Sequence, residues 1–322
     1  TSLKISAIAL AVSPSKGRSE RATPMTAPSP FFANAFDSDL RGDGLFLAES
    51  PRVIRRALHA MHADERGAAR MVPSVRPLEL LACDEAIEEI GEAVGFFPLV
   101  IHRITHDALT ALTGYRMHDG AIMLCSRPGA PSAKRRKSED AACADLDAFA
   151  AALPPACSVL AGDGIVHTDN IGSLFRNAAC FGDAGVLLSE RCGDPLNRKA
   201  VRIASGRTFT VPWARAASLH DALAHLRNRH GFALLAVEDC PGAKALWDAP
   251  MPPRCIFVFG AEGAGVRQAT MEACGTTVNL PMQAHHDLRE QDDLPSLNVA
   301  VTSALVLGER RRRQAQAVAG TA

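Results

Sequence analysis

Neither an excess of one charge nor a long apolar run is present in this sequence. Over 322 residues, 35 Lys and Arg balance 35 Asp and Glu, so any binding to a polyanion such as nucleic acid must depend on local basic clusters. No run approaches the roughly 18–20 apolar residues of a membrane-spanning helix, and no membrane partner is expected. A hydrophobic content of 47% with 22% charged residues is typical of a globular protein with a sizeable core.

Paired cysteines are also missing. The nine cysteines are scattered, with no C-x-x-C pair. This favours reduced thiols in a cytoplasmic location and argues against a disulfide framework or a structural zinc site. Because residues 1–36 contain four basic side chains and few acids, an organellar presequence is the alternative. The run His285-His286-Asp287 is a poor metal set, since adjacent histidines do not easily share one ion, and no metal is expected.

Local patterns divide the chain into five segments. A segment rich in Ser, Pro and Ala predicts a poorly ordered tail at 1–38. Residues 39–128 alternate strand and helix patterns, as in a small α/β domain, and Pro–Gly breakers predict a linker at 129–155. From 156 to 314 the alternation becomes regular, which predicts a parallel sheet with helices on both faces. Residues 315–322 are expected to form a second tail.

A glycine-rich turn is the first candidate for a ligand site. The strand-like run 255–259 leads into the turn 260–265, and ligands of parallel sheets bind beyond the carboxyl ends of the strands. The order G-x-x-G-x-G matches neither the dinucleotide fingerprint nor the phosphate loop. The carboxylate of Glu262 would repel phosphate and suits a cationic or polar ligand. The need for a tight turn explains the glycines equally well, so an unrelated nucleotide-binding α/β enzyme stays open as an interpretation.

Two helices are expected beside this turn. Asp169 or Asn170 suits the N-cap of the first, which places Arg176 nearly two turns along it. Ser296 suits the N-cap of the second.

The second helix is apolar on nearly all sides from 297 to 307. It should be buried on two sides, one of them a subunit interface. Arg310 to Arg313 are expected to end it, since cations suit a helix C-terminus. A further strand is expected at 208–211, ended by Pro212.

Four segments, in this order, resemble the SpoU (TrmH-like) family of RNA ribose 2′-O-methyltransferases, part of the SPOUT superfamily. They are N-I-G-S-L-F-R-N-A-A-C-F-G at 170–182, I-F-V-F-G-A-E-G-A-G-V at 256–266, L-P-M at 280–282 and S-L-N-V-A-V-T-S-A-L at 296–305. The resemblance covers about 157–313. Residues 44–128 are similar, more loosely, to the ribosomal-protein-L30e-like substrate domain that many members carry.

The resemblance implies a C-terminal domain with a deep trefoil knot, a homodimer, S-adenosylmethionine as cofactor and ribosomal or transfer RNA as substrate. The cofactor contacts that it implies are Gly260, Leu280, Met282 and Leu297. The catalytic and site-shaping residues that it implies are Asn170, Arg176, Glu262, Ser296 and Asn298.

One departure from the family lies between the last two segments. The loop 283–295 is longer than is usual in the family, and Ala284 stands where glycine is usual. The alternative is therefore a non-catalytic RNA-binding member of the same fold, with activity weakened by this insertion.

Overall fold

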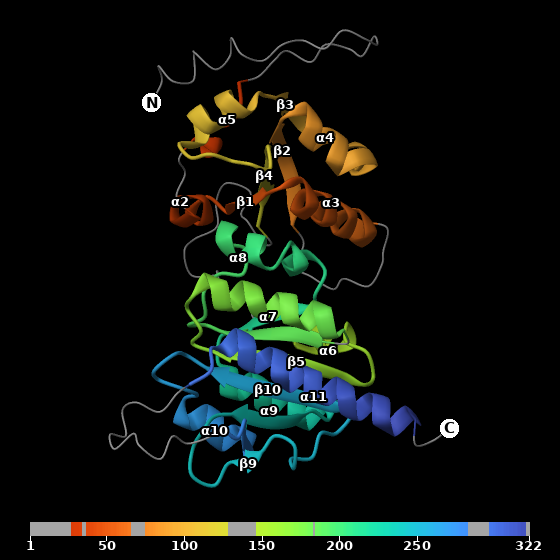
Figure 1. Cartoon of the computed structure of the whole chain (residues 1–322), viewed down its shortest axis with the longest axis vertical. Helices are drawn as coiled ribbons and strands as arrows, with labels where there is room; N and C mark the ends of the chain where they lie inside the picture. Colours follow the sequence, from red (N-terminus) through yellow and green to blue (C-terminus); the bar gives the residue numbers. More distant parts are fainter. Residues whose placement is uncertain are drawn as a thin grey trace. The chain divides into compact units, whose positions relative to one another are not determined.

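The computed structural model describes residues 27–33, 37–65, 75–127, 146–182, 184–282 and 296–319. The loop 283–295 and most of the expected tail and linker lie outside these ranges. The chain forms two compact units (Figure 1): an N-terminal unit of Thr1–Arg135 with Leu196–Thr210, and a C-terminal unit of Arg136–Pro195 with Val211–Ala322. No helix in the described ranges is long and apolar enough to cross a membrane.

The N-terminal unit is built on a four-stranded mixed sheet in the order β1-β4-β2-β3. Strand β4 is antiparallel to β1 and β2, and β3 is parallel to β2. The strands are β1 (Leu45–Glu49), β2 (Arg76–Ala82), β3 (Val100–Arg103) and β4 (Ala121–Ser126). The helices are α3 (Pro51–Glu65), α4 (Asp84–Ile90), η2 (Gly91–Phe96) and α5 (His106–Thr113).

Ordered structure in this unit also precedes β1. A short 3₁₀ helix, η1 (Pro30–Phe32), and helix α2 (Asp37–Gly42) come before it. Phe32 and Leu40 are buried in one core cluster with Leu47 and Leu124, so this part of the chain contributes apolar surface to the core.

The segment 196–210 belongs to the N-terminal unit and contains α8 (Arg198–Ile203) and η3 (Arg207–Phe209). The buried carboxylate of Glu49 holds it, with Arg198 Nε 3.3 Å away. The strand expected at 208–211 is wrong. Gly206 adopts a left-handed conformation after α8 and starts η3 instead, and Pro212 precedes the strand β7 (Trp213–Ala216).

The C-terminal unit contains a seven-stranded sheet in the order β7-β6-β5-β10-β8-β11-β9. Every pairing in it is parallel, as predicted. Its other strands are β5 (Cys157–Asp163), β6 (Ala184–Ser189), β8 (Ala233–Val237), β9 (Lys244–Ala245), β10 (Arg254–Gly260) and β11 (Thr277–Asn279).

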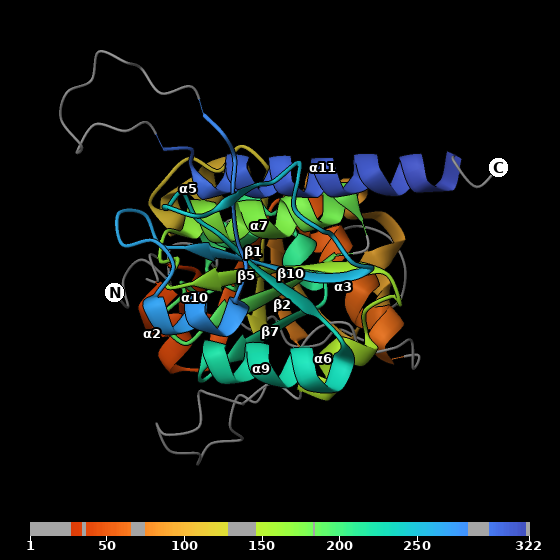
Figure 2. The ribbon, with the colours of Figure 1, turned by 90° about the horizontal axis from the view of Figure 1, so that it is seen from below.

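Helices cover both faces of this sheet, as the strand–helix alternation predicts. Figure 2 shows α7 (Thr168–Phe181) and α11 (Val299–Ala319) on one face and α6 (Leu146–Ala151), α9 (Leu219–His230) and α10 (Gln268–Cys274) on the other. Strands β5 and β10 are buried almost throughout, because helices cover both of their faces. None of the cysteines in the described ranges forms a disulfide.

Helix α11 differs from its prediction at both ends. It begins at Val299, where Asn298 Oδ1 accepts the N–H of Ala300 at 2.8 Å, so Asn298 and not Ser296 caps it. It does not end at Arg310 to Arg313 but continues to Ala319. The reason is that Arg310 is buried and donates to the carbonyls of Pro252 and Cys157, so it anchors the helix instead of terminating it.

Candidate active site

The glycine-rich turn lies at the carboxyl end of β10. Ala261 and Gly265 exchange two backbone hydrogen bonds of 3.2 and 2.8 Å, which fold the turn back on itself. A Cβ on Gly260 would lie 1.9 Å from the carbonyl carbon of Gly265 and 2.2 Å from the nitrogen of Val266. Glycine at 260 is therefore required by the close approach of two backbone segments.

Glu238 and Asp239, which directly follow the neighbouring strand β8, support this region. Glu238 Oε2 accepts the N–H of Val266 at 2.9 Å, just after the turn. Asp239 Oδ1 accepts Asn279 Nδ2 at 2.8 Å, at the end of β11. The ends of β8, β10 and β11 are thus fixed relative to one another by side chains.

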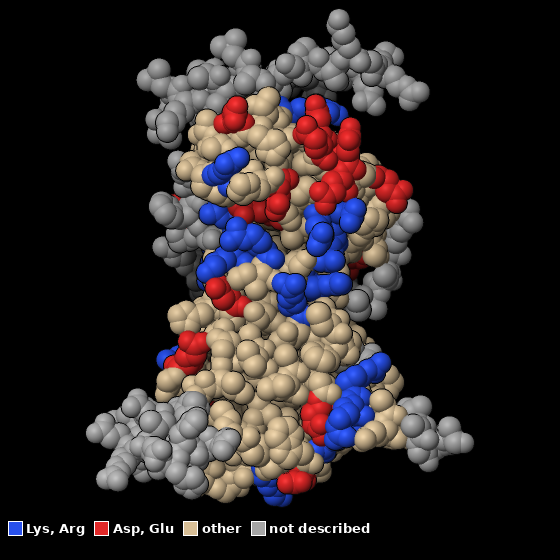
Figure 3. Space-filling view, in the orientation of Figure 1, with Lys and Arg blue, Asp and Glu red and all other residues tan. Residues whose placement is uncertain are grey.

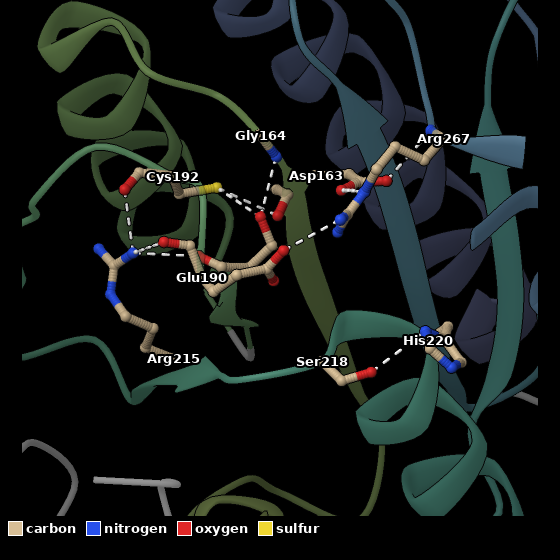
Figure 4. A network of polar contacts seen from close by, with 10 residues as sticks. Asp163, Gly164, Glu190, Cys192, Arg215, Ser218, His220 and Arg267 are labelled. Carbon is tan, nitrogen blue, oxygen red and sulfur yellow. Dashed lines mark hydrogen bonds and ion pairs between the residues drawn. The ribbon is translucent and has the colours of Figure 1, made fainter. Parts of the chain in front are cut away.

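Asp163, the last residue of β5, fixes the chain beyond the glycine turn. Its buried carboxylate accepts the backbone N–H of Arg267 at 3.1 Å and Arg267 Nε at 2.6 Å, and Arg267 Nη1 reaches Glu190 at 3.0 Å (Figure 4). Burial lowers the pKa of Arg267, but the bonds to Glu190 and Asp163 outweigh it, so the pKa is raised overall. Arg267 is therefore a permanent cation that links β5, β6 and the turn.

Arg215 organises the loop after β6 in the same network (Figure 4). Its guanidinium donates to the carbonyls of Ser189, Cys192 and Gly193 at 3.0, 2.9 and 2.7 Å. The backbone N–H of Gly164 donates to Ser189 Oγ at 2.9 Å, which joins this loop to the segment that leads into α7. A rigid polar frame thus surrounds the carboxyl ends of β5 and β6.

Helix α7 begins at Thr168, two residues earlier than expected, with His167 at its N-cap position. The prediction that Asp169 or Asn170 caps this helix is wrong. Asn170 is buried in the first turn, and its side chain points to other segments instead of to its own backbone.

Three of the predicted site residues meet at this point. Asn170 Nδ2 donates to Glu262 Oε1 at 2.7 Å, and Asn298 Nδ2 lies 3.1 Å from both Glu262 Oε1 and Asn170 Oδ1. His167 Nε2 lies 3.8 Å from the other carboxylate oxygen of Glu262. The start of α7, the glycine turn and the start of α11 are thereby joined at one carboxylate.

Arg176 and Ser296 are not part of this network. Arg176 is exposed on α7, and within the described ranges neither side chain forms a hydrogen bond or an ion pair. The neighbouring Asn177 instead binds α11, with Nδ2 2.7 Å from the carbonyl of Ala300 and 2.9 Å from Ser303 Oγ. The guanidinium of Arg176 is therefore exposed, next to the contact through which Asn177 joins α7 to α11.

The predicted cofactor residues differ in exposure. Leu280 is 8% exposed, whereas Met282 and Leu297 are 37% and 43% exposed. Large exposed apolar side chains on either side of the 283–295 loop leave apolar surface for a ligand or a partner.

Asp163, Glu238 and Arg267 were not predicted. Asp163 and Glu238 each follow a buried strand at the edge where ligands bind, a position that would have indicated them. Arg267 follows the glycine turn without a comparable signal.

The fold and the site define a parallel-sheet α/β protein with a polar site at the carboxyl ends of its central strands. The model of the SpoU rRNA methylase family matches residues 158–308, which contain every predicted site residue. Over these residues the chain is similar to that family, which confirms the resemblance predicted from the four segments.

Named relatives agree. The chain is 29% identical over 274 residues, or 84% of its length and 82% of the relative, to an uncharacterized tRNA/rRNA methyltransferase of Mycobacterium tuberculosis. It is 29% identical over 206 residues, or 64% of its length and 74% of the relative, to the 23S rRNA (guanosine-2′-O-)-methyltransferase RlmB of a Burkholderia species.

A solved structure shows the same fold. The SpoU methyltransferase AviRb from Streptomyces viridochromogenes superposes with a TM-score of 0.67 at 18% identity, covering 89% of this chain and 96% of AviRb. AviRb has also been solved in complex with the cofactor AdoMet; that structure superposes with a TM-score of 0.65 at 20% identity, over 88% of this chain and 96% of AviRb.

Proposed function

We propose that this protein transfers a methyl group from S-adenosylmethionine to a ribose 2′-hydroxyl of ribosomal or transfer RNA. The observation that carries the proposal is the meeting of Asn170, Glu262 and Asn298, from three family segments, at the carboxyl ends of the central strands. The names of relatives as rRNA and tRNA methyltransferases support the substrate class.

The residues at the glycine turn fit the proposed cofactor. Because two backbone segments approach closely at Gly260, the base of the turn carries no side chain. Leu280, which directly follows β11, adds an apolar side chain. The Glu262 carboxylate suits a cationic ligand. S-adenosylmethionine, when bound, would supply an electrophilic methyl group on a positively charged sulfur.

Arg176 is the proposed positioning group for the RNA. A ribose hydroxyl is a weak nucleophile, so it must be held in line with the methyl group and lose its proton. Because arginine stays protonated, Arg176 orients the nucleotide phosphate and the hydroxyl, and the phosphate assists proton loss. Lysine would replace it poorly, because the guanidinium binds phosphate through two parallel bonds.

The N-terminal unit is the proposed RNA-binding part. Burial lowers the pKa of Arg56, and the nearby charges of Arg207, Arg52 and Arg55 lower it further. Figure 3 shows Lys and Arg gathered on this unit. A cluster of like charges favours a polyanion, since phosphates relieve the repulsion.

We also propose a homodimer and a knotted C-terminus. Val301 and Leu305 on α11 are 48% and 47% exposed, and Figure 3 shows a largely uncharged surface over α7 and α11. Such a surface suits a subunit interface. The proposed knot would use the contacts of the C-terminal segment: β11 pairs with β8, α11 packs on α7, and Asn298 reaches Glu262 in the glycine turn.

The variant Arg176→Ala tests the role of Arg176. We expect methyl transfer to RNA from cells lacking this protein to fall at least about 100-fold, because mispositioning a reactant costs that much. Binding of S-adenosylmethionine, measured by calorimetry, should be unchanged. The matched control is Arg229→Ala, an exposed arginine on α9 on the other face of the sheet, which should keep full activity. Normal turnover in Arg176→Ala would contradict the assignment.

Calorimetry also distinguishes the proposed enzyme from a non-catalytic RNA-binding member. The wild-type chain should bind S-adenosylmethionine. If it binds RNA but not the cofactor, the non-catalytic interpretation is correct. Mapping ribose methylation in RNA from cells with and without the protein would then identify the nucleotide.

A further inference from the structure

Two histidines and an aspartate converge on the face of the C-terminal unit away from α7 and α11. His225 Nε2 lies 2.8 Å and His230 Nε2 lies 2.6 Å from the same oxygen, Asp147 Oδ1. Within the described ranges, this is the group of three His, Cys, Asp or Glu side chains whose ligand atoms all lie within 4.8 Å of one another. It takes no part in the proposed active site, whose polar residues come from other segments.

The three side chains come from two packed helices. Asp147 is in the first turn of α6, and His225 and His230 are in the second half of α9, whose last residue is His230. The two imidazole rings are 5.8 Å apart at their centroids and tilted by 50°, so they do not stack. Both point a ring nitrogen at one carboxylate oxygen, which is the convergent arrangement that a shared cation requires.

We propose that Asp147, His225 and His230 bind one divalent transition-metal ion of the zinc type, which clips α6 to α9. Two imidazoles and one carboxylate suit zinc, cobalt or nickel better than magnesium or calcium, which prefer all-oxygen sites. Zinc binds such nitrogen and oxygen atoms at about 2.0–2.2 Å, so two of its ligand atoms lie about 3.0–3.5 Å apart. The present N···O separations of 2.8 and 2.6 Å need only a small opening to admit the ion.

Exposure indicates a site open on one side. The side chains of His225 and His230 are 33% and 24% exposed, and that of Asp147 is 53% exposed. An ion held by three protein ligands at this depth keeps a position for water. Because the ligands join two helices of one unit, the expected role is to hold α6 against α9.

Zinc titration of the metal-free full-length protein tests the site. At neutral pH, calorimetry with zinc chloride should show one equivalent whose affinity falls at least tenfold in His225→Asn and in Asp147→Asn. The matched control is His220→Asn, also on α9 but paired with Asp221, which should leave the affinity unchanged. Wild-type protein that binds no zinc, or binding that survives in both site variants, would overturn the proposal.

A spectroscopic measurement covers the case in which a site variant fails to fold. Cobalt bound to the wild-type protein should show visible d–d bands without the thiolate-to-metal charge-transfer band expected at a cysteine site, since the protein has free thiols elsewhere. A thiolate band at one equivalent would assign the ion to cysteines and refute the proposal. Zinc should also raise the melting temperature of the wild type, and of His220→Asn, by the same amount.

Discussion

Replacing Arg310 by methionine tests the anchor that the structure assigns to α11. Arg310 is only 4% exposed, and no acidic side chain in the described part of the chain pairs with it. Instead, Nη1 donates to the carbonyl of Pro252 at 2.8 Å and Nη2 to that of Cys157 at 3.2 Å. Methionine keeps much of the volume and removes the donors.

The expected loss follows from these contacts. Two buried hydrogen bonds from a charged donor contribute about 1.5–3 kcal/mol each, or about 3–6 kcal/mol together. Nη2 also donates to the carbonyl of Pro253 at 2.5 Å, but that oxygen keeps the backbone N–H of Cys157 as a partner when the arginine is replaced. The contacts to the carbonyl of Met251, at 3.5 Å, and to the weakly accepting Cys255 Sγ, at 3.4 Å, add little. Part of this loss is offset, because the substitution also removes the desolvation cost of a buried cation whose Nε has no hydrogen-bond partner in the described part of the chain. We therefore expect the free energy of unfolding to fall by about 3 kcal/mol.

Tryptophan fluorescence in urea measures this change in the relevant unit alone. The sequence contains 2 tryptophans, Trp213 and Trp247, and both lie in the C-terminal unit. The control is Arg312→Met on the same helix, whose side chain is 53% exposed and paired with Glu309, so it should cost about 0–1 kcal/mol. Equal losses in the two variants would refute the view that Arg310 is an internal anchor.

Two further changes test the glycine turn and the end of α11. Gly260→Ala should weaken binding of S-adenosylmethionine at least tenfold in calorimetry, because the added Cβ would lie 1.9 Å from the backbone of Gly265. The control Gly95→Ala, with open space around the added Cβ, should leave the affinity unchanged. Equal affinities in the two variants would show that the turn is not the cofactor site. Hydrogen bonding from Arg312, opposed by burial and helped by Arg313, lowers the pKa of Glu309 from 4.5 to about 2. A carboxyl group whose pKa is lowered on folding stabilises the folded state fully at pH values above its ordinary pKa. The difference in free energy of unfolding between wild type and Glu309→Gln, measured in urea, should therefore shrink as the pH falls from 4.5 to about 2. A difference that stays constant over this range would contradict the lowered pKa.

The architecture of the C-terminal unit could be predicted because most of its strands can be recognised from the local sequence alone. Runs such as 157–163 and 254–260 are apolar on both faces, which only a buried strand of a parallel sheet requires. The two-residue strand β9 gives no such signal, because its pairing with β11 depends on where the rest of the chain places it.

The site was predicted from the order of family segments and not from local pattern. Asn170 and Glu262 are 92 positions apart, and nothing near Asn170 in sequence indicates its partner. The incorrect N-cap at Asn170 has the same origin. A side chain that suits a cap by type is used in a long-range contact, and the helix starts without a side-chain cap.

Helix α11 explains why the site and the sheet depend on each other. Asn298, at its start, reaches Glu262 at the carboxyl end of β10, while Arg310 binds the carbonyls at the amino ends of β5 and β10. At 1.5 Å per residue, the twelve steps between them span about 18 Å. Strand β10 rises about 3.3 Å per residue, and its six steps from Arg254 to Gly260 span about 20 Å. The part of the chain from Asn298 to Arg310 is therefore about as long as strand β10, and it is held at both ends of the sheet. Ser303, buried between these ends and bonded to Asn177 of α7, fixes its middle. The position of Asn298 at the site thus also depends on contacts at the opposite end of the strands and on α7, which no motif around Asn298 contains.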